Sequence, residues 1–257
     1  MPKLPQIKRS RRKDNPEARM SIGDHLRELR QRLFVSAAGV MVMTVVGYLV
    51  YERAFALITR PIEQANAKGA HLTLNFDTIL ASFDMKLEVS IWLGILFSSP
   101  LWIYEFWAFV GPGMTRKEKA YTWAYGTAGL FLFLAGAALG IWVMPRAVAI
   151  LTSFIPNGPT AGVIGANLYL SFIMRMVLAF GIAFLLPEVL VALNMLGLMQ
   201  GKTMLKGWRW AIVGIVTFMA IVNPMPDPWS MIFMSVPIAG LYFLACFISI
   251  RHDKRVE

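Results

Sequence analysis

Six apolar segments, each bounded by charged residues, proline or glycine, alternate with polar segments along this chain. They lie at residues 33–51, 86–108, 121–143, 168–187, 209–223 and 230–249. An apolar run of about 20 residues is long enough to cross a bilayer as a helix. The pattern therefore predicts an all-α polytopic membrane protein with six transmembrane helices.

Two segments have unusual lengths. The fifth has 15 residues, which at the helical rise extend only about 22 Å, less than the hydrocarbon core of about 30 Å. The apolar stretch 168–199 is too long for one simple span, and we expect Pro187 and Glu188 to mark a kink or the end of the fourth helix.

Composition agrees with a membrane protein. Of 257 residues, 57 % are hydrophobic and 16 % charged, whereas soluble domains carry about 25 % charge. The net charge of +10 comes from basic residues that flank the apolar segments, which argues against nucleic-acid binding and for contact with the lipid bilayer. The single cysteine, Cys246, excludes an internal disulfide and a cysteine metal cluster. We expect neither a metal nor a cofactor.

The distribution of Lys and Arg predicts the orientation. Residues 1–32 carry ten, and the segments 110–119, 197–209 and 249–257 together carry nine, whereas the alternate loops carry four. The positive-inside rule therefore predicts that both termini are cytoplasmic. We expect a disordered basic tail at 1–20, one membrane domain at 21–250 and a C-terminal tail at 251–257; no cleavable signal peptide is expected.

The segment HLRELRQRL, residues 25–33, stands directly before the first span. Ser21 with Asp24 has the pattern of a capping box, and leucines recur at helical spacing, which predicts an amphipathic helix at the inner surface. Glu28 falls opposite the leucine stripe. It either pairs with Arg32 at i, i+4 or is available to a ligand.

A second acid lies in a cytoplasmic loop, WAFVGPGMTRKEKA, residues 107–120. Its Gly-Pro-Gly turn keeps the loop tight, so Glu118 is expected near the membrane surface. Two carboxylates at one interface could bind two guanidinium groups as bidentate pairs.

Five stretches in order resemble the TatC family, the receptor subunit of the twin-arginine protein translocase. They are HLRELRQRL, Arg60-Pro61, SSPLWIYEFWAFVGPGMTRKEK, YLSFIMRMVLAFGIAF and the run Pro226-Asp227-Pro228-Trp229-Ser230. The resemblance covers roughly residues 21–250. It implies six helices shaped like a cupped hand in a bacterial inner membrane, with the last two spans short.

The resemblance also implies roles for individual residues. Glu28, Arg30, Phe109 and Glu118 match positions that recognise the paired arginines of signal peptides on folded proteins, and Pro61 and Asp227 match outer-loop positions important for translocation. The implied partners are TatA, TatB and other receptor copies, with the proton-motive force as energy source.

The chain departs from the family pattern at two places. The family often has a polar residue two positions before the proline of span four, where this chain has Leu185. Glu188 either restores a carboxylate near that face or ends the helix at the interface. Glu105 stands where the family usually has Gln.

Charges within the predicted spans have to face a wet concavity or reach the surface. Arg175 lies in span four, and Glu88, near the outer end of span two, is a candidate partner. Gly136 and Gly140 form a GxxxG that is more typical of close helix packing than of a dedicated dimer face.

The sequence disfavours enzymatic functions. All three histidines lie outside the spans and no acidic pair lies at mid-membrane, so we expect no catalytic residues. The alternative function is a secondary transporter of a small solute that uses Arg175 and Glu88, but it predicts paired interrupted segments in two halves of the chain, and these are absent.

Overall fold

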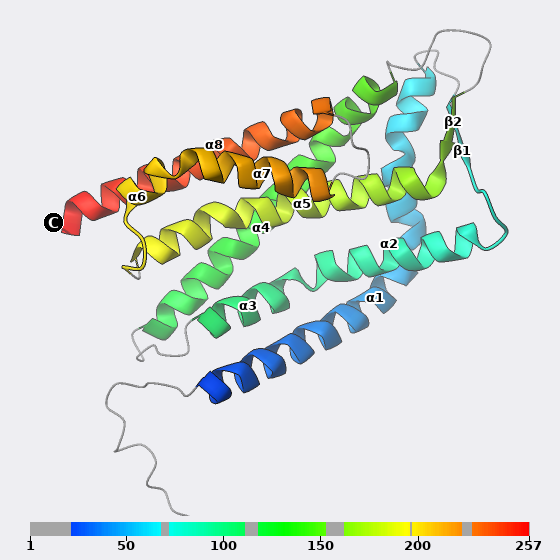
Figure 1. The fold of residues 1–257 in the computed structure, drawn as a ribbon. Helices are drawn as coiled ribbons and strands as arrows, with labels where there is room; N and C mark the ends of the chain where they lie inside the picture. The colour runs from blue at the N-terminus through cyan, green and yellow to red at the C-terminus, as the bar shows by residue number, and fades with distance from the viewer. Residues whose placement is uncertain are drawn as a thin grey trace, which may run out of the picture.

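The protein is a bundle of long helices with one small sheet. The computed structural model describes residues 22–67, 72–110, 118–152, 162–195, 197–222 and 228–256. The elements are α1 (Ile22–Ala67), β1 (Leu72–Asn75), α2 (Ala81–Phe97), α3 (Ser99–Val110), α4 (Glu118–Thr152), β2 (Gly162–Gly165), α5 (Ala166–Met195), α6 (Gly201–Lys206), α7 (Trp208–Val222) and α8 (Pro228–Val256). The start of α1 and the end of α8 lie at the same end of the bundle (Figure 1).

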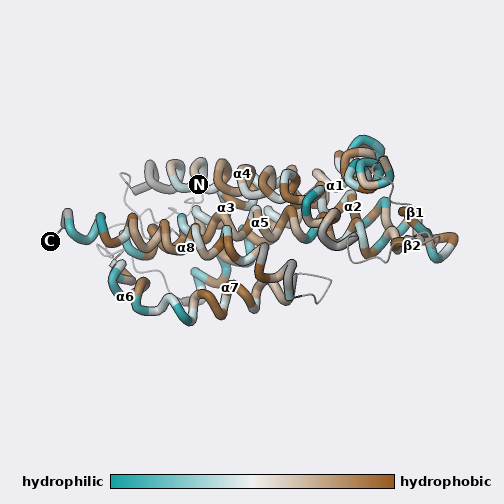
Figure 2. Tube along the Cα trace, turned by 90° about the horizontal axis from the view of Figure 1, so that it is seen from above, coloured by the Kyte–Doolittle hydropathy of each residue, from teal (hydrophilic) through white to brown (hydrophobic). Residues whose placement is uncertain are grey.

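The helices are membrane-spanning in length and composition. Among the described residues, four are long and apolar enough to cross a bilayer, within α1, α4, α5 and α8, and the pair α2–α3 makes a fifth span if its two parts cross together. The helix α7 is apolar but has only 15 residues, as the sequence predicted for span five. Figure 2 shows apolar residues along the middle of the long helices and polar ones at α6 and at the end of α8. The protein is thus an all-α polytopic membrane protein.

The helix α5 forms the centre of the bundle, and α1 lies at its edge. In the most apolar window of α5, 56 % of residues are buried, compared with 6 % in that of α1. The exposed apolar side chains of α1 include Leu33, Phe34 and Leu49, which is the pattern expected of a lipid-facing helix. The main core forms where α5 packs on α4, α8 and α2.

The glycines of the GxxxG sequence pack α4 against α5. A Cβ at Gly140 would lie 2.9 Å from Cα of Val177, and one at Gly136 would collide with the carbonyl of Phe180. Small residues of this kind let helix backbones approach closely where lipid provides no hydrophobic drive for association. The pattern therefore makes an internal helix contact, as expected.

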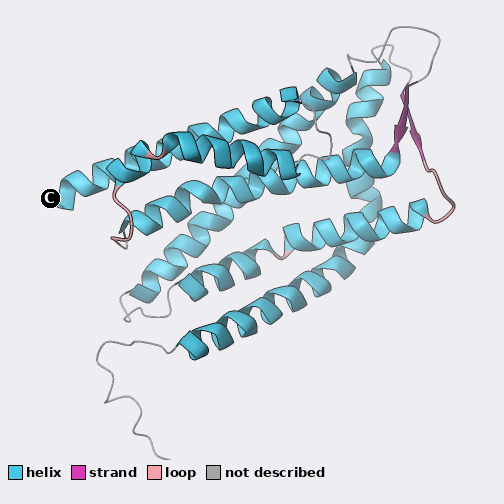
Figure 3. Ribbon diagram, viewed as in Figure 1, coloured by secondary structure: helices cyan, strands magenta, loops and turns pink. Residues whose placement is uncertain are grey.

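The second predicted span is broken. It was expected as one helix over 86–108, but α2 and α3 meet at Ser98 with a bend of 54°. Pro100 has no N–H to donate to the carbonyl four residues back, which breaks the hydrogen-bond ladder. The indole Nε1 of Trp102 donates to the carbonyl of Ile95 at 3.0 Å, so a side chain supplies a donor at the break. Figure 3 shows the short loop between the two helices.

Two helices continue through a proline. The helix α1 runs on through the buried Pro61 to Ala67. The hydroxyl of Tyr169 on α5 donates to the carbonyl of Ile58 at 2.8 Å, in the turn that Pro61 interrupts. The helix α5 likewise continues past Pro187 and Glu188 to Met195, so of the two alternatives, a kink or a helix end, the helix end is wrong. Proline is tolerated within a membrane helix where neighbouring helices stabilise it.

The segment after α1 and the segment before α5 form a sheet that the sequence did not indicate. Strand β1 pairs with β2 in parallel, with Leu72 opposite Gly162 and Asn75 opposite Gly165. The side chain of Asn66 receives the N–H of Leu72 at 2.8 Å and donates to its carbonyl at 2.9 Å. These bonds tie the end of α1 to the sheet, which is drawn in magenta in Figure 3.

The C-terminal residues extend α8 instead of leaving the bundle. The carboxylate of Asp253 accepts the N–H of Gly201, at the start of α6, at 2.7 Å and the side-chain amide of Asn194, at the end of α5, at 2.7 Å. A carboxylate at a helix N-terminus satisfies an otherwise unpaired N–H. The helix α8 has 29 residues and is long and apolar enough to cross a bilayer, whereas the 15-residue α7 is a shorter apolar helix.

Replacing Tyr169 by Phe should lower the stability of the bundle. The change leaves the buried ring in place but removes the hydroxyl that binds Ile58, a loss of about 1 kcal/mol. Thermal unfolding in detergent measures the effect, with Tyr48→Phe, at an exposed position on α1, as the control. Equal midpoints for the two variants would contradict the assignment.

Replacing Gly136 by Leu should push α4 away from α5. Overpacking of a close contact costs about 1–3 kcal/mol, and the expected result is a lower unfolding temperature. Ala138→Leu is the matched control, because Ala138 is exposed on the same helix. A Gly136→Leu protein as stable as this control would show that the close approach is dispensable.

Candidate functional site

The first turns of α1 place an acid and a base on one face. Glu28 and Arg32 are separated by one helical turn, and Nε and Nη2 of Arg32 both donate to Oε1 of Glu28, at 3.0 and 2.5 Å. The predicted i, i+4 pair is thus present. Glu28 is therefore engaged by its own helix.

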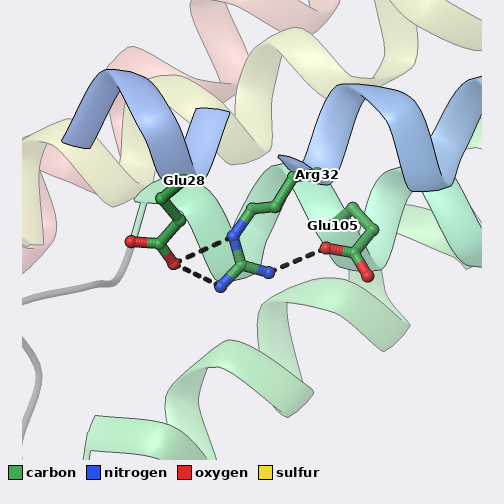
Figure 4. Close-up of polar contacts among 3 residues, drawn as sticks. All are labelled: Glu28, Arg32 and Glu105. Carbon is green, nitrogen blue, oxygen red and sulfur yellow. Dashed lines mark hydrogen bonds and ion pairs between the residues drawn. The ribbon is translucent and has the colours of Figure 1, made fainter. Parts of the chain in front are cut away.

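A second acid, Glu105 on α3, completes the cluster. Its Oε2 accepts a hydrogen bond from Nη1 of Arg32 at 2.7 Å. Figure 4 shows the guanidinium of Arg32 lying between the two carboxylates. The three side chains retain only 16–25 % exposure, so water partly screens their charges.

The cluster faces an open cavity of about 550 Å³. Its lining comprises Asp24, Arg27, Glu28, Gln31, Arg32, Val35 and Glu105. Three of these side chains are acidic and two are basic, so the lining has an excess of one negative charge. Such a cavity has the size and charge to take a cationic side chain.

An aromatic contact joins the same two helices. The ring of Phe109, at the end of α3, stacks on that of His25, with centroids 4.4 Å apart and planes inclined by 17°. Phe109 therefore lies near the cluster and holds the first turn of α1 to α3. Arg30 is exposed and is not among the residues that line the cavity.

Of the other predicted site residues, two fall outside the described part of the chain and one is buried within α1. Glu118 is the first residue of α4, but its side chain, like the whole of Asp227, is outside the described part of the chain. Ser21, expected in a capping box, is outside it too. Pro61 is buried within α1.

The charges within the spans do not pair as suggested. Glu88 accepts a hydrogen bond from the hydroxyl of Ser171 at 2.6 Å and a longer one from Trp92. Arg175, one turn further along α5, is half-buried and makes no ion pair with the described acids. The carboxylate of Glu88 thus pairs with the neutral hydroxyl of Ser171 and not with the guanidinium of Arg175.

Glu188 is buried at the meeting of α3, α4 and α5. It is 6 % exposed, and neither carboxylate oxygen has a hydrogen-bond partner of good geometry among the described residues. A Cβ at Gly129 would lie 2.6 Å from Oε2 of Glu188 and 3.2 Å from Nε1 of Trp107. Glu188 does not end α5, which continues to Met195, and its carboxylate is buried between helices.

Sequence reasoning singled out Glu105 as a departure from a family pattern but assigned it no partner. One signal was available, because Glu105 is the single charge in the apolar stretch SPLWIYEFWAFV of α3. A charge among apolar residues has to find a partner or water. Its partner could not be deduced, because the packing of α1 on α3 is a long-range contact.

Comparison with known proteins agrees with this architecture. Residues 24–237 match the family model described as Sec-independent protein translocase protein (TatC). The chain is 42 % identical to the TatC of Xylanimonas cellulosilytica, over 93 % of the chain and 87 % of that protein. It is 36 % identical to the TatC of Rothia mucilaginosa, over 95 % and 84 %, and 30 % identical to the chloroplastic protein of Arabidopsis thaliana, over 87 % and 64 %.

The fold is also similar to a solved structure. The crystal structure described as twin arginine translocase receptor TatC superposes with a TM-score of 0.77, at 26 % identity, over 88 % of this chain and 97 % of that one. The family model, the relatives and the fold all agree: the chain belongs to the TatC family of Sec-independent protein translocase subunits.

Proposed function

We propose that this chain is the signal-peptide receptor of a twin-arginine translocase in a bacterial plasma membrane, with both termini in the cytoplasm. It binds the paired arginines of signal peptides on folded proteins and does no covalent chemistry. It assembles with the single-span subunits TatA and TatB and with further receptor copies, and the proton-motive force drives transport.

The observation that carries this proposal is the acidic cavity at the junction of α1 and α3. Its carboxylates already hold a guanidinium, that of Arg32, at hydrogen-bonding distance. Carboxylates positioned in this way recognise a second arginine by the same charge-assisted bonds. Glu118, the first residue of α4, supplies the acid for the other arginine of the pair.

An apolar cavity of about 350 Å³ suits the hydrophobic part of a signal peptide. Its walls come from α1, α2, α4 and α5 and include Leu57, Trp92, Met144 and Val177. Binding begins at the acidic cavity, and the apolar segment of the peptide then enters the bundle here. The apolar spans of the described helices carry few charged residues, too few to line a channel for a folded protein, so TatA and TatB provide the passage.

The alternative, a solute transporter based on Arg175 and Glu88, has less support. Glu88 binds Ser171 instead of Arg175, so the two charges do not form the joint site that this function would need. Measured solute flux in vesicles without capture of a twin-arginine peptide would favour the transporter.

Glu28→Gln should weaken capture of a twin-arginine peptide at least about tenfold, because a hydrogen bond to a charged group contributes about 1.5–3 kcal/mol. Combination with Glu118→Gln should abolish capture. The measurement is fluorescence binding of a labelled peptide, with two adjacent arginines before an apolar segment, to the protein in lipid nanodiscs.

The matched control is Glu63→Gln, which removes an exposed carboxylate from the far half of α1 and should leave binding unchanged. Full binding by the Glu28→Gln, Glu118→Gln double variant would refute the receptor site.

A further inference from the structure

Arg32 occupies the position that a ligand arginine would take. Its guanidinium uses three of its five N–H groups, two on Oε1 of Glu28 and one on Oε2 of Glu105. Each carboxylate therefore contributes a single oxygen to the cluster. An incoming arginine that binds Glu28 as a fork has to compete with Arg32 for Oε1.

We propose that Arg32 is a built-in competitor for the signal-peptide arginine and that Glu105 retains it during exchange. In the resting protein Arg32 bridges both acids. When a peptide arginine binds Glu28, Arg32 gives up its Nε and Nη2 bonds and stays paired with Glu105 through Nη1. The inference rests on the proposed function and assigns two further residues, Arg32 and Glu105, to its specificity.

The charges of the cluster favour such an exchange. Two carboxylates and one guanidinium leave one negative charge unbalanced, so the cluster can take one more cation. After the exchange each guanidinium has one carboxylate. Without Glu105, Arg32 would be left unpaired next to a second guanidinium, and this like-charge contact would oppose binding.

The partial exposure of the cluster allows fast exchange. The three side chains keep 16–25 % of their surface accessible, and ion pairs in contact with water are weak. The bonds also join α1 to α3 only through flexible side chains, so Arg32 can turn from one acid toward the other without movement of either helix. Side-chain rotations of this kind take picoseconds to nanoseconds.

Competition by Arg32 also gives a preference for arginine over lysine. Arg32 makes two bonds to Oε1 of Glu28, and a guanidinium can replace both with its planar fork, whereas an ammonium is a point charge without this geometry. Removing the competitor should therefore favour a lysine peptide more than an arginine peptide. Because a peptide has to displace Arg32, the presence of Arg32 lowers the affinity of Glu28 for a peptide, and it lowers it more for lysine than for arginine.

A double-mutant cycle tests the exchange. Binding of the twin-arginine peptide and of its Lys-Lys counterpart is measured in nanodiscs for the native protein, Glu105→Gln, Arg32→Gln and the double variant. A salt concentration of about 0.15 M screens the long-range effect of removing a charge. Glu105→Gln should weaken arginine-peptide binding about three- to fivefold in the native background, the range of a partly exposed ion pair.

In the Arg32→Gln background the same change should have little effect, because no competitor has to be retained. Arg32→Gln alone should bind the arginine peptide at least as tightly as the native protein and should reduce the Arg/Lys preference. An equal loss on Glu105→Gln in both backgrounds, or no loss in either, would overturn the exchange and leave Glu105 as a simple negative charge or a structural residue.

Two controls separate the exchange from folding and from the receptor function. Arg32→Lys keeps the positive charge without the fork, and it should give an intermediate Arg/Lys preference if Arg32→Gln fails to yield a monodisperse protein. Glu28→Gln is measured in each background. If it never weakens binding, the receptor site itself is wrong; if it does while the cycle is additive, only the exchange is wrong.

Discussion

A chain in a bilayer has to satisfy its backbone polar groups internally, and this constraint determines where the bundle can depart from regular helix. At three places where a helix bends, contains a proline or begins, a side chain makes a hydrogen bond to a backbone group nearby. Trp102 donates to Ile95 at the α2–α3 bend, Tyr169 donates to Ile58 near Pro61, and Asp253 receives the first N–H of α6.

The bilayer also restricts where charged side chains can lie, and this explains the position of the proposed receptor site. Charged side chains are costly at the centre of the bilayer but inexpensive at its edge, so a cluster of Glu28, Arg32 and Glu105 belongs where α1 begins and α3 ends. The apolar cavity lies further along the bundle, lined by α1, α2, α4 and α5. A charged cluster followed by a separate apolar cavity matches a peptide in which charged residues precede an apolar segment.

The sequence predicted those features that depend on local periodicity. The apolar segments indicated the long helices and the short α7, and the spacing of Glu28 and Arg32 indicated their pair. It failed at features that depend on packing between distant segments. A periodic pattern does not specify which helices are neighbours. It therefore did not indicate that α1 passes through Pro61, that α5 continues past Pro187 or that Glu105 pairs with Arg32. Four-residue strands such as β1 are also too short to give a distinct alternation.

The parallel pairing of β1 with β2 makes the two ends of the bundle mechanically unequal. The strands join the loop after α1 to the start of α5 by backbone hydrogen bonds in a register of four residue pairs. Separation of α1 from α5 at that end would break the whole ladder. Near the start of α1 the hydrogen-bond and ring contacts with α3 are made by side chains, among them the guanidinium of Arg32 and the stacked rings of His25 and Phe109, so among the described residues no backbone ladder resists separation of the helices there.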